Sequence, residues 1–139
     1  MKITLVPPEH VFQVWPDIRG YLEPAVETSH GRWTLEHLLA VLCNGRSQLW
    51  IAFDDEGIWG ALTTEITNYP AKRCLSMHFL GGAEFDRWYS DMLKQISHFG
   101  KEMDCDGIEG TARFGFWKFL KQDGFEKCAA FYEKGMRNG

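Results

Sequence analysis

Two side chains suited to proton transfer, Glu65 and His78, lie on neighbouring predicted strands of this 139-residue sequence. Histidine titrates near neutral pH, so His78 is a candidate general base. Glu65 would act as the base itself, or orient the imidazole, if the two strands pair in a suitable register. Each also has an ordinary interpretation, His78 as a half-buried ring with satisfied nitrogens and Glu65 as a solvated or ion-paired carboxylate. Both interpretations stay open.

A third candidate, Arg113, stands directly after a predicted strand and before the aromatic-rich residues 114–119. Its guanidinium is suited to a phosphate or carboxylate ligand, and equally to an internal ion pair with Glu109 or Glu65. The aromatic residues exceed what one face of a short helix can bury, so some would contact a ligand or a partner protein, and the rest the predicted long helix. Lys118 alone supplies too little positive charge for a nucleic-acid groove, and the formal net charge of the chain is −4.

The sequence favours neither a metal site nor a membrane span. Its four cysteines are scattered without a C-x-x-C pair, and no histidine stands at zinc-ligand spacing, so we expect reduced cysteines and no metal. The first ten residues hold a short apolar run broken by two prolines, too brief for a secretory signal. No stretch approaches the roughly 18 apolar residues that a membrane span needs. These features predict a soluble, cytoplasmic protein with no membrane or nucleic-acid partner.

The elements that must position these side chains follow from hydrophobic periodicity. Alternation predicts strands at 2–6, 48–53, 58–66, 73–80, 108–112 and 128–134. Helical spacing predicts a helix over 11–22 that Pro16 and Pro24 bend or break, a short helix capped by Thr34, a long helix over 85–103 and a short aromatic helix over 114–121. We expect a single domain over residues 1–139, α/β (α+β) in class, with a central mixed, mostly antiparallel twisted sheet and helices on both faces.

This element order resembles that of the GNAT N-acetyltransferases over nearly the whole chain. Short clusters strengthen the likeness: Leu49-Trp50, Thr64-Glu65-Ile66 with Tyr69-Pro70, Leu80-Gly81-Gly82 with Trp88, and residues 113–117 before Gly124-Phe125. Within that superfamily the chain most resembles short GNAT-like proteins of phage and prophage genomes. The resemblance implies a sheet that splays apart between its fourth and fifth strands and holds acyl-CoA in the gap.

The resemblance also implies a cofactor-binding junction between the fourth strand and the long helix. The family pattern there is (Arg or Gln)-x-x-Gly-x-(Gly or Ala), whose amides hold the CoA pyrophosphate. Here the junction is Phe79-Leu80-Gly81-Gly82-Ala83, and Gly81, Gly82 and Ala83 would form a small anion nest. The full pattern is absent, and Glu84 and Asp86 would repel a pyrophosphate. In the alternative interpretation the glycines end a strand and the acids begin a helix.

The family's usual general acid is a Tyr four residues before the Gly-Phe of the last helix, and that position is Leu120 here. The family's frequent Asn falls near Arg113. Tyr132, on the last predicted strand, is the candidate substitute for the acid.

Two functions follow from this resemblance. In the first, the chain is a divergent acyl-CoA-dependent N-acetyltransferase that binds acetyl-CoA near Phe79–Ala83 and Arg113, uses Glu65 or His78 as base, and acetylates a small-molecule or protein amine. In the second, it is a non-catalytic phage or prophage GNAT-like protein, a virion-associated or protein-interaction component. That protein would be found in the host cytoplasm or virion and would bind phage structural proteins. Either protein is a candidate homo-oligomer.

Overall fold

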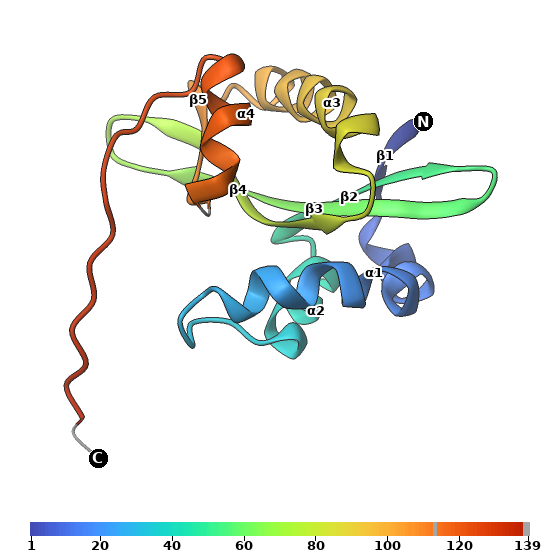
Figure 1. The fold of residues 1–139 in the computed structure, drawn as a ribbon, viewed down its shortest axis with the longest axis horizontal. Helices are drawn as coiled ribbons and strands as arrows, with labels where there is room; N and C mark the ends of the chain where they lie inside the picture. The colour runs from blue at the N-terminus through green and yellow to red at the C-terminus, as the bar shows by residue number, and fades with distance from the viewer. Residues whose placement is uncertain (113, 138–139) are drawn as a thin grey trace.

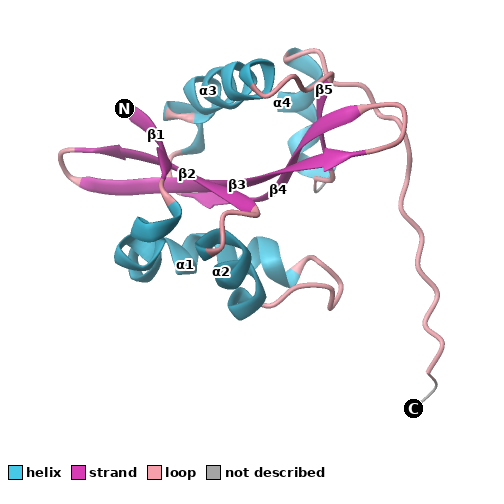
Figure 2. Cartoon of the chain, turned by 180° about the vertical axis from the view of Figure 1, so that it is seen from behind, coloured by secondary structure: helices cyan, strands magenta, loops and turns pink. Residues whose placement is uncertain are grey.

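A single five-stranded sheet with helices on both faces forms the body of the molecule (Figures 1 and 2). The structure is a computed structural model and describes residues 1–112 and 114–137. Its strands are β1 (Lys2–Val6), β2 (Ser47–Asp54), β3 (Gly57–Asn68), β4 (Arg73–Gly82) and β5 (Gly107–Gly110). Its α-helices are α1 (Val11–Glu27), α2 (Leu35–Cys43), α3 (Tyr89–Glu102) and α4 (Trp117–Gln122), with 3-10 turns at Pro8–His10, Phe85–Arg87 and Phe114–Phe116.

The strands lie in sequence order, β1-β2-β3-β4-β5. Every neighbouring pair is antiparallel except β4 and β5, which run parallel because α3 connects them. The turn between β2 and β3 is the predicted hairpin, in which Gly57 takes φ = 143° and Asp54 accepts a hydrogen bond from the Glu56 amide at 2.9 Å. The predicted mixed, mostly antiparallel sheet with helices on both faces is confirmed.

Helices α1 and α2 cover one face of the sheet, and α3 covers the other (Figure 1). Thr34 caps α2 as predicted, since its hydroxyl accepts from the His37 amide at 3.2 Å. The long helix was predicted from residue 85, but a 3-10 turn occupies Phe85–Arg87 and α3 begins at Tyr89. The predicted apolar stripe is confirmed in α3, where Met92 and Ile96 are fully buried.

Of the bent or broken first helix that Pro16 and Pro24 predict, the break does not occur, because α1 runs continuously through both residues. Each proline removes one backbone hydrogen bond. Pro24 lies four residues after Gly20, which has no side chain, and near the end of the helix. Burial of one face of α1 against the sheet offsets these losses; its buried residues are Val11, Trp15, Ile18, Leu22 and Val26.

The prediction of a last strand at 128–134 is also wrong. After α4 the chain continues as an extended segment without strand pairing through residue 137, and it leaves the body of the molecule in both ribbon views (Figures 1 and 2). Phe131 is 72% exposed and Tyr132 89% exposed. We call residues 126–137 the extended segment.

Two further predictions concern disulfides and membrane spans. All four cysteines are free, as expected. No helix in the described part of the chain has the length and hydrophobicity to cross a bilayer.

Candidate functional site

A β-bulge between β3 and β4 sets the geometry of the site. Thr63 pairs with Phe79 and Thr64 with Met77, so His78 is the extra residue of β4. The Phe79 amide donates to the Thr63 hydroxyl at 3.1 Å. Beyond the bulge, β4 also parts from β5, because their pairing covers only Cys74–Met77 and Gly107–Gly110.

A mainly apolar cleft opens where β4 and β5 separate, and it encloses about 100 Å³. The bulged part of β4 forms one wall and the chain leaving β5 forms another, while α3 and α4 close the top. The wall residues are Met77, His78, Phe79 and Leu80 from β4, Gly110, Thr111 and Ala112 after β5, Tyr89, Met92, Leu93 and Ile96 from α3, and Phe116, Leu120 and Phe125 around α4. The predicted splay between the fourth and fifth strands is therefore present.

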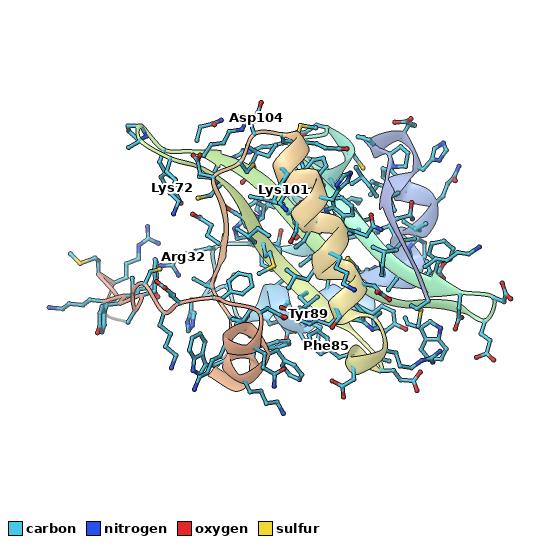
Figure 3. The ribbon with its side chains drawn as sticks, turned by 90° about the horizontal axis from the view of Figure 1, so that it is seen from above. Arg32, Lys72, Phe85, Tyr89, Lys101 and Asp104 are labelled. Atoms are coloured by element: carbon cyan, nitrogen blue, oxygen red, sulfur yellow. The ribbon has the colours of Figure 1, made fainter. Side chains whose placement is uncertain are left out.

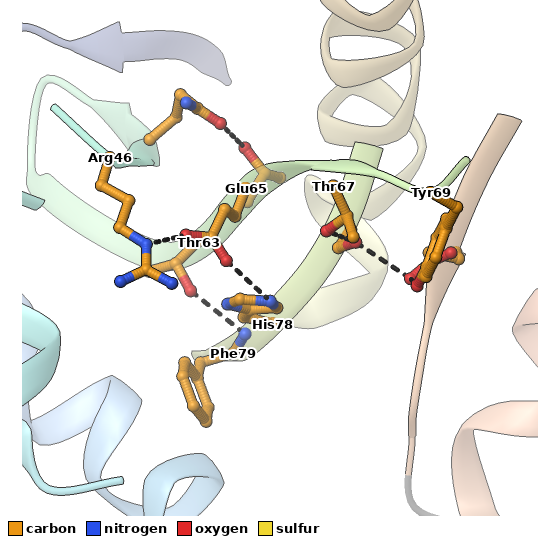
Figure 4. A network of polar contacts seen from close by, with 11 residues as sticks. Arg46, Thr63, Glu65, Thr67, Tyr69, His78 and Phe79 are labelled. Carbon is orange, nitrogen blue, oxygen red and sulfur yellow. Dashed lines mark hydrogen bonds and ion pairs between the residues drawn. The ribbon is translucent and has the colours of Figure 1, made fainter. Parts of the chain in front are cut away.

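His78 stands at the wall of this cleft with one ring nitrogen facing a carboxylate. Its Nε2 lies 3.7 Å from Oε2 of Glu65, whose Oε1 accepts a hydrogen bond from Nε of Arg46 at 2.7 Å (Figure 4). The Nδ1 atom is buried and has no hydrogen-bond partner among the described residues. Burial lowers the pKa of His78, against an opposing effect of the Glu65 carboxylate. His78 is thus neutral at neutral pH and has a nitrogen free to accept a proton.

The residues around His78 hold its ring in place. Trp33, from the loop before α2, has its ring centroid 5.9 Å from that of His78. Glu65 pairs directly opposite Ser76 on β4, and Ser76 lies opposite Glu109 on β5. The pairing of β3 with β4 therefore brings Glu65 within 3.7 Å of His78, and the role of Glu65 stays a prediction.

Glu109 lies on the same row of the sheet and accepts the hydrogen bonds of a second polar network. Its Oε2 accepts hydrogen bonds from the Tyr69 hydroxyl at 2.7 Å and from the Ser76 hydroxyl at 3.0 Å. Burial acts to raise the pKa of Glu109, but hydrogen bonds from Tyr69, Cys74 and Ser76 outweigh it and the pKa is lowered. The Glu109 carboxylate is therefore ionised, and Glu65 and Glu109 both lie opposite Ser76, two residues before His78 on β4.

Tyr89 is a residue of the cleft that sequence analysis missed. It lies at the start of α3 (Figure 3), and its buried hydroxyl has no partner within the described chain. Burial raises the pKa of Tyr89 to about 12, with a smaller contribution from the charge of Asp123. In the sequence, Tyr89 fits the apolar stripe of the predicted long helix. Its hydroxyl, on an otherwise apolar helix face, is the feature that could have indicated a role in the cleft.

Comparison with known proteins shows which solved structures have the same architecture. No family model and no curated protein sequence matches the chain. Among solved structures it is similar to a probable acetyltransferase, with a TM-score of 0.72 and 16% identity over 100% of this chain and 99% of that one. It is similar to the ribosomal-protein-alanine N-acetyltransferase from Brucella melitensis biovar Abortus 2308, with a TM-score of 0.70 and 12% identity over 98% and 100% of the two chains.

A predicted acetyltransferase with acetyl-CoA from Clostridium acetobutylicum superposes with a TM-score of 0.69 at 12% identity, over 97% of this chain and 96% of that one. The chain has the GNAT fold. At these identities the likeness extends to the fold alone, so the chemistry rests on the residues themselves.

The junction that holds pyrophosphate in a typical GNAT protein is built differently here. Gly81 and Gly82 belong to β4, where they pair with Ala61 and Gly60. A side chain on Gly81 would meet the Tyr21 carbonyl, and one on Gly82 the Trp59 carbonyl. These glycines end β4, as the alternative interpretation expected, and their lack of side chains allows the close packing there.

The remaining donors at this junction are also engaged. The Ala83 amide donates to the Trp59 carbonyl at 2.7 Å, so it is not free to bind an anion. Glu84 follows with φ = 52° and pairs with Arg87 at 2.7 Å.

The other predicted site residues divide into three groups. Phe79 and Leu80 line the cleft, and so does Leu120, where the family pattern places its Tyr. Tyr132 lies on the extended segment and is not among the residues that line the cleft, and its role as a substitute acid stays a prediction. Arg113 lies outside the described residues. No group of three or more metal-ligating side chains occurs within residues 1–112 and 114–137.

Proposed function

We propose that this chain is a divergent N-acetyltransferase that moves an acetyl group from acetyl-CoA to an amine. One observation carries the proposal: a neutral histidine with an unpartnered, buried nitrogen stands at the wall of an apolar cleft between diverging strands. Such a polar atom is costly to bury without a partner and is typical of a functional site. The fold shared with acetyltransferases supports the same reaction class.

The residues present fit one end of acetyl-CoA better than the other. The apolar walls, together with the backbone of β4 beyond Met77, suit an acetyl thioester and the amide-bearing arm next to it. At the phosphate end, Glu84 and Asp86 are acidic, and the Ala83 amide and the Arg87 guanidinium are already engaged. We therefore expect weak binding of the phosphates, with most of the affinity coming from the buried arm.

Different side chains of the protein would carry out different steps of acyl transfer. Acetyl-CoA supplies the activated acetyl group as a thioester. Once the acceptor amine has given its extra proton to solvent, Nδ1 of His78 takes the proton that the neutral nitrogen loses as it bonds to the acetyl carbon. The carbon–sulfur bond breaks in the same step, and CoA leaves as the thiolate. Glu65 holds the ring from the Nε2 side, and with Glu109 it attracts a cationic amine.

Tyr89 acts as a hydrogen-bond donor to the reacting centre. With a pKa of about 12 its hydroxyl stays protonated at neutral pH, so it stabilises developing negative charge without giving up its proton. The apolar walls exclude the water that would otherwise hydrolyse the thioester.

Calorimetric titration with acetyl-CoA tests binding, and acetylation of a panel of amines tests turnover. We expect binding in the wild type, with turnover reduced at least a hundredfold in His78→Ala and binding retained. His98→Ala is the matched control, because His98 is an exposed histidine whose ion-pair partner within the described residues is Glu102 on α3. Absence of binding at millimolar acetyl-CoA contradicts the proposal, and unchanged turnover in His78→Ala removes His78 from the mechanism.

The acidic start of the α3 region and Leu120 favour a second function, a GNAT-like protein without acyl transfer. That protein would be a virion-associated or interaction component of a phage or prophage, found in the host cytoplasm or the virion. Failure to bind acetyl-CoA together with co-purification with phage structural proteins would favour this function.

A further inference from the structure

A row of polar side chains crosses four strands of the sheet beside the cleft. Ser47 on β2 pairs with Glu65 on β3. Glu65 pairs in turn with Ser76 on β4, and Ser76 pairs with Glu109 on β5. Directly opposite residues project from the same face of a sheet, so these four side chains share one face. We call Ser47, Glu65, Ser76 and Glu109 the polar row.

The polar row lies on the face of the sheet that packs against α1 and α2. Ala61 belongs to the core beneath those helices, and Glu65 follows it by four residues on β3, so the two side chains point to the same face. The cleft reaches this face as well, because Ala25 of α1 and Thr28 just after it belong to the cleft wall. A molecule bound at the polar row would therefore also meet the cleft beside His78.

Glu109 gives one end of the polar row its negative charge. Its carboxylate accepts hydrogen bonds from two neutral hydroxyls, those of Tyr69 and Ser76. None of the ion pairs within the described residues includes Glu109. Lys72 lowers the pKa of Glu109 through its charge, more weakly than these hydrogen bonds do. Glu109 is thus an ionised, partly buried carboxylate whose direct contacts are neutral.

Glu65 has its charge partly compensated. Arg46 donates to its Oε1 at 2.7 Å, and His78 faces its Oε2 at 3.7 Å (Figure 4). Because His78 is neutral at neutral pH, a single positive charge stands in direct contact with the two carboxylates Glu65 and Glu109 within the described chain. The polar row therefore attracts one further cation, and its partial burial strengthens that attraction.

Two polar atoms at the same site have no hydrogen-bond partner among the described residues. They are the hydroxyl of Ser47, which is 3% exposed, and Nδ1 of His78. Ser47 stands opposite Glu65 within the polar row, and His78 faces the same carboxylate from β4. A buried polar atom without a partner is costly and is typical of a site that a ligand completes. Charge and unpaired polar atoms thus point to one ligand.

We infer that the acceptor is a short diamine, whose second ammonium group binds at the polar row against Glu109 while its neutral nitrogen meets Nδ1 of His78. The inference rests on the proposed acetyl transfer. His78 lies two residues beyond Ser76 on β4, about 7 Å along a strand, and four methylene groups separate the nitrogens of diaminobutane by a comparable distance. A monoamine would reach His78 but leave the polar row empty.

The reaction on such an acceptor stops after one transfer. The reacting nitrogen loses its proton to Nδ1 of His78 as it bonds to the acetyl carbon, the carbon–sulfur bond breaks, and CoA leaves as the thiolate. The ammonium at the polar row keeps its charge throughout. The product is the monoacetylated diamine, whose acetamide end is neutral and cannot replace an ammonium group beside Glu109.

Turnover of diaminobutane and of butylamine, compared by kcat/KM, tests the acceptor class. The wild type should prefer diaminobutane by about tenfold or more, and Glu109→Gln should lose most of that preference. Glu109→Gln keeps an oxygen that can accept from Tyr69 and Ser76, and urea unfolding checks that it is folded. Glu102→Gln, which removes an exposed carboxylate on α3, is the matched control and should keep the wild-type preference.

The outcomes separate this inference from the proposed function. Acetylation of both amines at equal kcat/KM, or a preference that survives in Glu109→Gln, overturns the diamine site and leaves the acetyltransferase in place. If acetyl-CoA does not bind, the proposed function fails, and calorimetric titration of diaminobutane alone then decides. Binding that is weakened by salt and lost in Glu109→Gln supports the site, whereas absent binding or equal binding in both proteins overturns it.

Discussion

The hydroxyl of Thr63 accepts a hydrogen bond from the backbone amide of Phe79, and this contact holds open the bulge that carries His78. Thr63 is fully buried, so Thr63→Val would leave the Phe79 amide buried without an acceptor. We expect a loss of about 1–3 kcal/mol in the free energy of unfolding, measured by urea denaturation. Thr63→Ser keeps the acceptor and should lose less; a larger loss in Thr63→Ser than in Thr63→Val would mean that the methyl group, not the hydroxyl, stabilises the bulge.

The lowered pKa of His78 predicts that acid destabilises the protein. The unfolded chain takes up a proton near the ordinary histidine pKa of about 6.5, whereas folded His78 does so only at lower pH because it is buried. Between those two values the unfolded state binds more protons, so the free energy of unfolding falls as the pH falls. Urea unfolding at pH 7.5 and pH 5.5 should show a smaller difference for His78→Gln than for wild type.

The matched variant for that measurement is His98→Gln. His98 is exposed, so its replacement should leave the pH dependence of the wild type in place. A pH dependence that survives unchanged in His78→Gln would show that His78 is not the group responsible.

Much of the fold follows from the sequence because it depends on local patterns. The hairpin at Asp54–Gly57 and the apolar stripe of α3 need only alternation, a glycine with positive φ and helical spacing. The continuous α1 could not be predicted from local patterns. Its prolines are tolerated because one face of the helix is buried against a sheet whose strands come mostly later in the chain. The prediction of a last strand is wrong for a different reason. The composition of residues 128–134 is typical of a strand, but a strand forms only when it pairs with the edge of a sheet. In the structure this segment pairs with no strand of its own chain.

The candidate site was partly predictable. His78 and Glu65 were identified from residue type and strand position, and their proximity follows once β3 and β4 pair. The bulge that contains His78 is bridged by a hydrogen bond from the Phe79 amide to the Thr63 hydroxyl, which no periodicity reveals. Tyr89 was hidden in the apolar stripe because a tyrosine ring packs like any other apolar group.

Charges on either side of His78 should move its pKa in opposite directions. The Glu65 carboxylate raises the pKa of the imidazole, and the Arg46 guanidinium lowers it. Glu65→Gln should therefore lower the pKa further, while Arg46→Gln should raise it, as followed by NMR titration of the ring protons. Glu109 raises the same pKa more weakly, so Glu109→Gln should lower it by a smaller amount than Glu65→Gln. A shift in one direction for both Glu65→Gln and Arg46→Gln would point to a rearranged site.

Removing the Tyr89 hydroxyl should cost activity without costing stability. The hydroxyl is buried and has no partner in the described chain, so Tyr89→Phe relieves a desolvation penalty and should leave the free energy of unfolding unchanged or raise it by about 1 kcal/mol. If the hydroxyl donates to the reacting centre, turnover should fall by about tenfold or more. Phe85, which stacks on Tyr89 at 4.6 Å between ring centres, offers a control in Phe85→Leu, expected to lose stability. A destabilised Tyr89→Phe would mean that the hydroxyl has a structural partner.

Restoring the family's tyrosine provides the sharpest test of the proposed chemistry. Leu120 lines the cleft from α4 and is only partly buried, so Leu120→Tyr can extend a hydroxyl toward the cleft without overfilling the core. An additional proton donor for the departing sulfur should raise turnover several-fold if the chain is an acetyltransferase. Phe119→Tyr is the matched control, because it adds the same hydroxyl one residue away, within the aromatic contacts to Phe85 and Tyr89. Equal turnover in the two variants would show that a hydroxyl at position 120 has no special access to the reaction.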